Sequence, residues 1–339
     1  MKIAVATTTI RVPVAMRALA ACAPAVRFFV AGDRKSPHTE IEMLCREIGN
    51  AEYLYNATMH GPYAPYDSTC RRNIALLAAL RWGADIIVLW DDDNLMINSG
   101  HFHLFDYRIE RAFHGLQATG PWFDPGSLTL PPVHHRGFPH AYRVRGDSPP
   151  CDVPSVLRPV TGAKVGVAAG LWLGDPDIDA CDRIAGAPRV HGIAEIARAG
   201  VVVDPKQTWT VFNSQNTAFV RELAPAMMML PGVGRHEDIF ASLITQRVMR
   251  ELGYVTHFGL PLVFQERNSH DLLDDLSLET FGMRHTLDFA TWLGAMDLGF
   301  APVLNMVRMI YSRMSAIPWM PPQVREAGLA WCDDVEKVL

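Results

Sequence analysis

The chain has 339 residues, of which 49% are hydrophobic, so it can bury the core of one large α/β domain or of two smaller domains. Its 31 Lys and Arg against 36 Asp and Glu give a formal net charge of −5, which excludes a broad basic surface for nucleic acid. No apolar run reaches the roughly 18 residues of a membrane-spanning helix, the first residues are too polar for a signal peptide, and the 6 cysteines form no CxxC pair. We therefore expect a soluble, cytoplasmic protein with reduced thiols, no nucleic-acid partner and no membrane span.

Residues 2–93 alternate short β-rich runs with helical segments, a pattern typical of a parallel sheet covered by helices. The expected strands are residues 3–8, 26–31, 51–55 and 85–90. The expected helices are residues 14–22, 39–48 and 67–82, the last with Asp67 or Ser68 as its N-cap. The sequence thus predicts a Rossmann-type half.

The composition changes to Pro, Gly, His and Arg over residues 122–159, which predicts an irregular, functional loop region. Further strands are expected at 168–173 and 208–212, then an amphipathic helix at 237–252 and an extended segment at 254–264. The remaining chain is mainly helical, around residues 287–296, 303–314 and 324–338. We expect a main domain over residues 1–275 and a helical extension, residues 276–339, packed on it.

Three consecutive carboxylates, Asp91, Asp92 and Asp93, follow the apolar strand expected at 85–90. Ligands bind at the carboxyl ends of strands in open α/β sheets. Adjacent carboxylates repel one another unless a cation neutralises them, and hard ions such as Mn²⁺ or Mg²⁺ prefer oxygen ligands and also bind phosphate. The run therefore indicates a metal–diphosphate site; the alternative is a solvated acidic turn or a helix N-cap.

A metal-bound diphosphate leaving group is the central device of nucleotide-sugar chemistry, because the ion stabilises charge that develops on UDP as the bond to the sugar C1 breaks. Phosphoryl transfer could use the same device. The sequence, however, has no GxxxxGK[ST] loop and no GxGxxG after a strand. A kinase and a dehydrogenase are therefore disfavoured.

Several short blocks, in order over about residues 5–265, resemble those of the reversibly glycosylated polypeptides, the UDP-arabinopyranose mutases. The blocks are Thr8-Thr9-Ile10-Arg11, Asp33, Asp67-Ser68-Thr69-Cys70-Arg71, Asp91-Asp92-Asp93, Asp124-Pro125, Arg136-Gly137-Phe138-Pro139, Gly170-Leu171-Trp172-Leu173 with Asp177 and Asp179, Asn216-Thr217-Ala218-Phe219 with Arg221-Glu222-Leu223, Gly234-Arg235-His236-Glu237-Asp238, and Gly259-Leu260-Pro261. This resemblance implies an α/β fold with a GT-A-like, Rossmann-type mixed sheet flanked by helices and followed by a helical C-terminal extension.

The resemblance also implies a UDP-sugar donor and Mn²⁺ or Mg²⁺ as cofactor. The family has a His shortly after the Gly-Leu-Pro block, where this chain has Gln265, with His270 a few residues later. The expected metal ligands are Asp91, Asp93 and His270, and Gln265 or water are open alternatives to His270.

Arg136 resembles the arginine that becomes glycosylated in the mutases. Its guanidinium could grip the diphosphate or accept the sugar covalently, and an ordinary loop arginine is the alternative. A guanidinium nucleophile would need neighbouring carboxylates to assist it. Glu237 and Asp238 open the helix expected at 237–252, where the helix dipole favours acidic residues regardless of function; we expect one of them, with Asp238 preferred, to act as general base.

Arg71 lies in the first turn of a helix, where the dipole disfavours a cation, so we expect a diphosphate nearby or an ion pair with Asp33 or Asp67. Trp172 could stack on a sugar or belong to the core. The residues expected to bind substrate are Thr9, Arg11, Asp33, Asp67, Arg71, Asp91, Asp92, Trp172 and Asn216.

These observations predict a UDP-sugar-dependent and metal-dependent glycosyltransferase that moves a glycosyl group to a small-molecule acceptor, for example in natural-product or nucleoside biosynthesis. One alternative is a pyranose/furanose mutase acting through glycosylation of Arg136. Another is a non-catalytic partner subunit with the same fold. The Met-rich helix expected at 303–314 is either packing or a dimer surface, so a homo-oligomer is one outcome.

Overall fold

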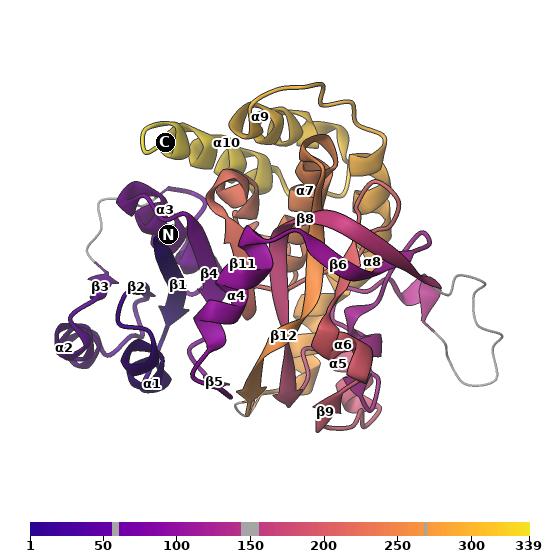
Figure 1. Ribbon diagram of the computed structural model, residues 1–339. Coiled ribbons are helices and arrows are strands. Elements are labelled where there is room, and N and C mark those ends of the chain that lie inside the picture. Colours follow the sequence, from indigo (N-terminus) through magenta and orange to yellow (C-terminus); the bar gives the residue numbers. More distant parts are fainter. Residues whose placement is uncertain (56–60, 144–155, 268–269) are drawn as a thin grey trace.

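The computed structural model describes residues 1–55, 61–143, 156–267 and 270–339. Its first half contains four parallel strands in the order β3-β2-β1-β4 (Figure 1). These strands are β1 Ile3–Thr9, β2 Arg27–Gly32, β3 Ala51–Leu54 and β4 Ile86–Trp90, and they alternate with α1 Ala15–Cys22, α2 His38–Ile48 and α3 Arg72–Trp82. This is the Rossmann-type half that the sequence predicts.

The parallel strands continue into a ten-stranded mixed sheet through β11, which is antiparallel to β4, and β8, which is antiparallel to β11. β12 lies parallel to β8. The additional strands are β5 Asn94–Met96, β6 Phe113–Thr119, β8 Val156–Gly174, β10 Val201–Val203, β11 Asn216–Val220 and β12 Tyr254–Gln265. Two reversals of direction make β8 and β12 parallel to β4, so β4, β8 and β12 end at the same edge of the sheet.

Helices cover both faces of the sheet. Successive strand side chains point to opposite faces, so Ala4 and Ala6 belong to one core and Val5 to the other. α1, α2 and α4 (His101–Glu110) pack on the Val5 face, whereas α3 and α7 (Glu237–Leu252) pack on the other. α3 is buried along most of its length, because the C-terminal helices cover its outer side.

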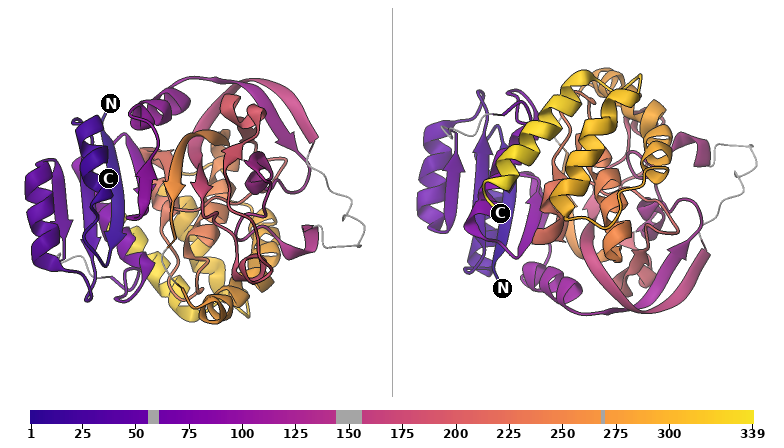
Figure 2. Two further views of the ribbon diagram at one scale, coloured as in Figure 1. Left: turned by 90° about the horizontal axis from the view of Figure 1, so that it is seen from below. Right: turned by 90° about the horizontal axis from the view of Figure 1, so that it is seen from above.

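The C-terminal helices are α8 Leu272–Gly294, α9 Val303–Arg313 and α10 Pro322–Glu336. Viewed from above, α9 and α10 lie across the helices of one sheet face (Figure 2). Met306, Ile310 and Met314 are buried there, so the Met-rich helix serves packing. The division at residue 275 stays a prediction; that residue lies inside α8. Within the described residues, no helix is long and apolar enough to cross a membrane.

Short elements complete the chain: η1 Thr69–Arg71, η2 Pro125–Leu128, β7 Thr129–Leu130, η3 His140–Tyr142, α5 Ala180–Ile184, β9 Gly192–Ile193, α6 Glu195–Ala199, η4 Arg221–Met227 and η5 Met314–Ala316. Ser68 caps η1 by accepting a hydrogen bond from the Cys70 backbone. The predicted fold class, an α/β mixed sheet flanked by helices with a helical C-terminal region, is confirmed.

The strand predicted at 208–212 is wrong. This segment forms only a bridge between Trp122 and Trp209. Side chains of α7 occupy its backbone donors instead: Thr210 donates to Gln246, and Phe212 donates to Ser242. The strand of this region is β11, which begins at Asn216. The prediction of an irregular segment over 122–159 is wrong at its end, because β8 begins at Val156.

Candidate functional site

The acidic run leaves β4 at the shared carboxyl edge of the strands. Arg72 of α3 donates to the Asp91 carboxylate, and the Thr9 hydroxyl at the end of β1 donates to Asp92 at 2.5 Å. Asp93 lies beside Gln265, the last residue of β12, which forms a hydrogen bond with it. Two strands, β1 and β12, and the helix α3 therefore place polar groups beside one short segment.

The acidic run carries charge that the protein only partly compensates. Burial and the neighbouring carboxylates raise the pKa of Asp91 to about 6, although Arg72 opposes the rise. Burial and Asp92 also raise the pKa of Asp93, while Gln265 and Arg11 act in the opposite direction. Raised pKa values mean that the ionised forms of these carboxyl groups are destabilised, and a bound cation would stabilise them.

The donor set fits Mg²⁺ or Mn²⁺ held jointly with a substrate. Asp91 and Asp93 supply the carboxylate oxygens that these ions prefer, and Mg²⁺ is commonly bound by one or two carboxylates together with substrate phosphates and water. The described residues contain no group of three or more His, Cys, Asp or Glu placed to hold a metal by themselves. His270 lies 3.5 Å from Asp275, and Gln265 is the residue beside Asp93. The predicted ligand His270 thus has a different neighbour in this conformation.

The ends of β1 and β2 are joined by a compact polar turn. Ser36 donates to the Thr9 carbonyl at 2.6 Å and accepts from the Asp33 backbone at 2.7 Å. The Asp33 carboxylate in turn accepts from the backbone of Asp67 at 3.0 Å and of Ser68 at 3.3 Å. Asp33 therefore organises the loop before α3, and its predicted contact with a nucleotide stays a prediction.

Arg71 is fully buried beneath this turn. Its guanidinium donates to the carbonyls of Gly32 at 2.9 Å and Ala64 at 3.2 Å and lies 4.4 Å from the Tyr66 ring centroid. Burial lowers its pKa. The geometry gives Arg71 a role in fixing the loop, whereas its predicted contact with diphosphate stays a prediction.

Arg136 is held by two carboxylates on different segments. Nε and Nη2 form a bidentate pair with Asp177 at 2.8 and 3.1 Å, and both terminal nitrogens contact Asp238 at 3.2 Å. Nη1 also donates to the Arg235 carbonyl. Every edge of the guanidinium is engaged, its exposure is 8%, and the two carboxylates raise its pKa well above the usual value against the effect of burial.

The two acidic residues at the start of α7 have different environments. Asp238 accepts from Arg136 and from the backbone and hydroxyl of Ser214 at 3.0 and 3.1 Å; burial opposes ionisation, but Arg136 lowers the pKa of Asp238 overall. Glu237 contacts the Thr69 hydroxyl at 3.2 Å, and burial raises its pKa to about 7. Glu237 is therefore the carboxylate that can exchange a proton near neutral pH.

A loop before β11 connects these groups. The sequence analysis did not predict this role for the loop. Ser214 accepts from Arg72 at 2.6 Å and donates to Asp238, Asn213 donates to Asp177 at 2.6 Å, and Gln215 donates to Gln265 at 2.5 Å. The loop thus joins the acidic run to the Arg136 cluster. Its polar sequence Asn213-Ser214-Gln215 before a strand was the available signal.

Trp172 and Asn216 are buried inside the protein. Trp172 is 1% exposed and packs near His135, and Asn216 binds the Pro261 carbonyl at 3.0 Å and His101 at 3.0 Å. Their predicted contacts with substrate stay predictions, and the geometry gives both a structural role.

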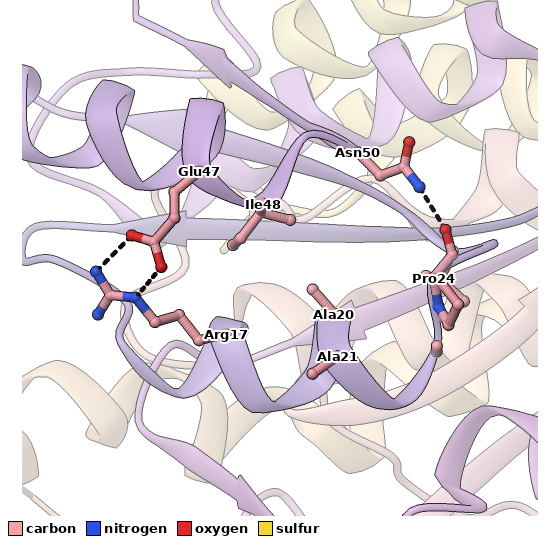
Figure 3. Close-up of a pocket in the computed structure, with 9 residues that line it drawn as sticks. Arg17, Ala20, Ala21, Pro24, Glu47, Ile48 and Asn50 are labelled. Atoms are coloured by element: carbon pink, nitrogen blue, oxygen red, sulfur yellow. Dashed lines mark hydrogen bonds and ion pairs between the residues drawn. The ribbon is translucent and has the colours of Figure 1, made fainter.

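A cavity of about 260 Å³ lies elsewhere, between the C-terminal ends of α1 and α2 (Figure 3). Its lining includes Ala20, Ala21 and Ile48, and the bidentate pair of Arg17 and Glu47, at 2.8 and 2.9 Å, closes one end. These helices run back from the carboxyl edge of the strands, so the cavity lies away from the acidic run. None of the predicted site residues lines it.

The fold and site together define an α/β protein with an acidic run at the carboxyl edge of its sheet. The resemblance predicted from the sequence is confirmed, because the family model described as "Reversibly glycosylated polypeptide" matches residues 152–314. Among curated proteins, the chain is 32% identical over 119 residues to "Probable UDP-arabinopyranose mutase 2" of Solanum tuberosum. It is 30% identical over 119 residues to UDP-arabinopyranose mutase 1 of Arabidopsis thaliana and 31% identical over 119 residues to that of Oryza sativa subsp. japonica.

Each of these matches covers 33% of this chain and 32% of the relative, so the chain matches about a third of the length of its curated relatives. Among solved structures, a mannosyltransferase from Pyrobaculum calidifontis in complex with GDP-Man and Mn²⁺ is 11% identical, with a TM-score of 0.37 over 98% of this chain and 86% of that chain.

Proposed function

We propose that the chain is an enzyme that binds a UDP-sugar at the carboxyl edge of β1, β2 and β4 and transfers the glycosyl group to a small acceptor. The observation that carries this proposal is the acidic run at the end of β4, in which the pKa values of Asp91 and Asp93 are raised and the carboxylate oxygens suit a divalent metal. The names of the matched relatives, which are UDP-arabinopyranose mutases, support a UDP-sugar as the donor.

In the proposed reaction the bond between the sugar C1 and the terminal phosphate oxygen breaks, and UDP leaves with the electron pair. An oxygen or nitrogen of the acceptor forms the new bond to C1 and passes its proton to Glu237, whose pKa of about 7 suits a general base. A metal bound by Asp91 and Asp93 would stabilise the charge that develops on UDP. Asp238 holds Arg136 and Ser214 and thereby positions the start of α7.

The alternative is a mutase in which Arg136 carries the sugar. Asp177 and Asp238 are the neighbouring carboxylates that such a nucleophile would need. The same carboxylates hold the guanidinium protonated, and all of its nitrogens donate to protein acceptors. This geometry favours Arg136 as a fixed cation, and therefore favours direct transfer over the mutase.

The test is UDP release from a panel of UDP-hexoses, UDP-pentoses and UDP-glucuronate with Mn²⁺ or with EDTA, together with intact-protein mass spectrometry. We expect metal-dependent release of UDP that falls at least tenfold in Asp93→Asn and is unchanged in Asp288→Asn, an exposed control. A sugar-sized mass increase that disappears in Arg136→Lys would instead establish the mutase. Failure of the metal-loaded protein to bind UDP would refute the enzyme and favour a non-catalytic partner subunit.

A further inference from the structure

Arg183, in α5, is a half-buried guanidinium that forms no ion pair with a carboxylate of the described residues. Its Nη2 donates to the Pro176 carbonyl, and its buried Nε has no hydrogen-bond partner in the part of the chain that the structure describes. Other arginines of this region behave differently: Arg136 is paired with Asp177, Arg143 with Asp179, and Arg235 with Asp275. A cation withdrawn from water without a counter-charge is costly, so its retention indicates a ligand that supplies the charge.

A second arginine increases the positive charge at this place. Burial lowers the pKa of Arg183 to about 10, and among nearby charges Arg267 lowers it most. Arg267 follows β12; its Nη2 donates to Asp275 at 2.8 Å, and its Nε is also buried, with no hydrogen-bond partner among the described residues. Asp275 is shared with Arg235 at 3.3 Å, so one carboxylate serves two guanidinium groups.

The carboxylates around Arg183 are engaged by other residues. Asp175, Asp177 and Glu279 each act to raise the Arg183 pKa, whereas burial, which has the largest effect, and Arg267 lower it. Asp177 is committed to Arg136, Glu279 accepts from Arg235 at 3.2 Å, and Asp175 accepts the Arg267 backbone N–H at 2.8 Å. Each carboxylate near Arg183 thus has another partner, and the described residues form no ion pair with its guanidinium.

The two arginines lie at the same carboxyl edge as the acidic run. The Asp175 backbone donates to the Gln265 carbonyl at 2.9 Å, which fixes the end of β8 against the end of β12. The Gln265 side chain lies beside Asp93, and Arg267 comes two residues later. An anion bound by the arginines would thus be a neighbour of the group bound at Asp91 and Asp93.

We propose that Arg183 and Arg267 form a binding site for an oxyanion of the substrate, either a sugar or acceptor carboxylate or a phosphoryl group. This inference rests on the proposed function, because it assigns the substrate class of the same edge. Arginine is suited to this task since its planar N–H groups match carboxylate and phosphate geometry. We therefore expect that the preferred substrate carries an anionic group near the transferred sugar, or that Arg183 and Arg267 bind its diphosphate.

The experiment measures the affinity of UDP, UDP-glucose and UDP-glucuronate by calorimetry for the wild type, Arg183→Gln and Arg183→Lys, with Arg46→Gln on the exposed face of α2 as matched control. If the oxyanion is a sugar carboxylate, UDP-glucuronate binds about tenfold more tightly than UDP-glucose, and only Arg183→Gln loses this preference fully. If it is a phosphoryl group, Arg183→Gln weakens all three ligands about tenfold. Unchanged affinities for all three in Arg183→Gln would overturn the proposal.

Thermal denaturation separates this inference from the proposed function. If the wild type binds no UDP ligand, the proposed function fails, and the site is judged with inorganic phosphate and glucuronate alone. Either anion should then raise the Tm of the wild type and of Arg46→Gln but not of Arg183→Gln. Equal shifts in all three proteins, or no shift in any, would refute the site. Without ligand, the Tm of Arg183→Gln should equal or exceed that of the wild type, because the substitution removes an uncompensated charge.

Discussion

Glu237 should make the stability of the protein fall as the pH rises. The carboxyl pKa of Glu237 is about 7 in the folded chain against an ordinary value of 4.5, so between these two pH values the folded state binds the proton more tightly than the unfolded state does. The stability that protonation of Glu237 contributes is therefore fully present below about pH 4.5 and is lost as the pH rises through 7. Glu237→Gln should therefore stabilise the protein at pH 8 by about 1–3 kcal/mol and by much less at pH 5.

Urea unfolding at the two pH values measures this difference. Glu195→Gln is the control, since the Glu195 side chain is 90% exposed, and it should show no such pH-dependent gain. An equal change in stability at both pH values for Glu237→Gln would contradict the shifted pKa. Glu237→Gln should reduce transferase activity although it stabilises the protein at pH 8. A residue kept for catalysis at a cost in stability shows this combination.

Asp177 should be needed for the stability of the Arg136 cluster. Asp177→Asn leaves the buried guanidinium with one charged partner, and breaking a buried pair costs about 3–5 kcal/mol. Chemical denaturation should show this loss, whereas the exposed control Asp288→Asn should change stability by less than about 0.5 kcal/mol. A loss below about 1 kcal/mol in Asp177→Asn would mean that Asp238 alone compensates Arg136.

At the residue scale, the sequence predicts groups that one segment carries and misses groups that several segments assemble. The acidic run is predictable because a buried strand leads directly into three carboxylates. The Ser214 loop was missed, because its importance depends on Arg72 and Asp238, which lie far away in the sequence. The Asp177 pairing was missed for the same reason.

At the element scale, α8 makes close contact with the start of α7 at one glycine. A Cβ on Gly282 would lie 1.9 Å from the His236 ring, which is fully buried and held under α8. Gly282→Ala should therefore destabilise the protein by about 1–3 kcal/mol through overpacking. Gly294→Ala, in the same helix, meets its nearest atom at 3.5 Å and should be neutral or stabilising by up to about 1 kcal/mol. Thermal unfolding of the two variants measures the contrast, and equal effects would refute the close packing.

Element boundaries were predictable where local signals agree. α7 begins and ends as predicted, because its apolar spacing is helical and Gly253 adopts the left-handed conformation that ends it. The failure at 208–212 has the opposite cause: its strand-like composition is overridden by side chains of α7 that occupy its backbone groups. β6 and β10 were missed because their partners in the sheet come from distant segments.

At the scale of the whole molecule, the C-terminal helices and the parallel half are expected to unfold together. Trp331 of α10 is fully buried, donates to the Pro225 carbonyl at 2.8 Å and packs against Tyr63 at 5.4 Å between ring centroids. Tyr63 also donates to Asp334 at 2.6 Å, and its segment includes Ala64, whose carbonyl Arg71 binds. The extension is thus tied to the loop that leads into α3.

Trp331→Ala should consequently cost about 3–5 kcal/mol and lower the Tm of one cooperative transition, because the cavity opens within a shared core. Phe300→Ala is the matched control, since Phe300 is 96% exposed and its loss removes little buried surface. Calorimetry distinguishes the possibilities. We would observe two separate transitions, with only the smaller one shifted by Trp331→Ala, if residues 276–339 formed an independent unit. That result would also mean that the C-terminal helices have no physical link to the edge of the sheet where the substrate is proposed to bind.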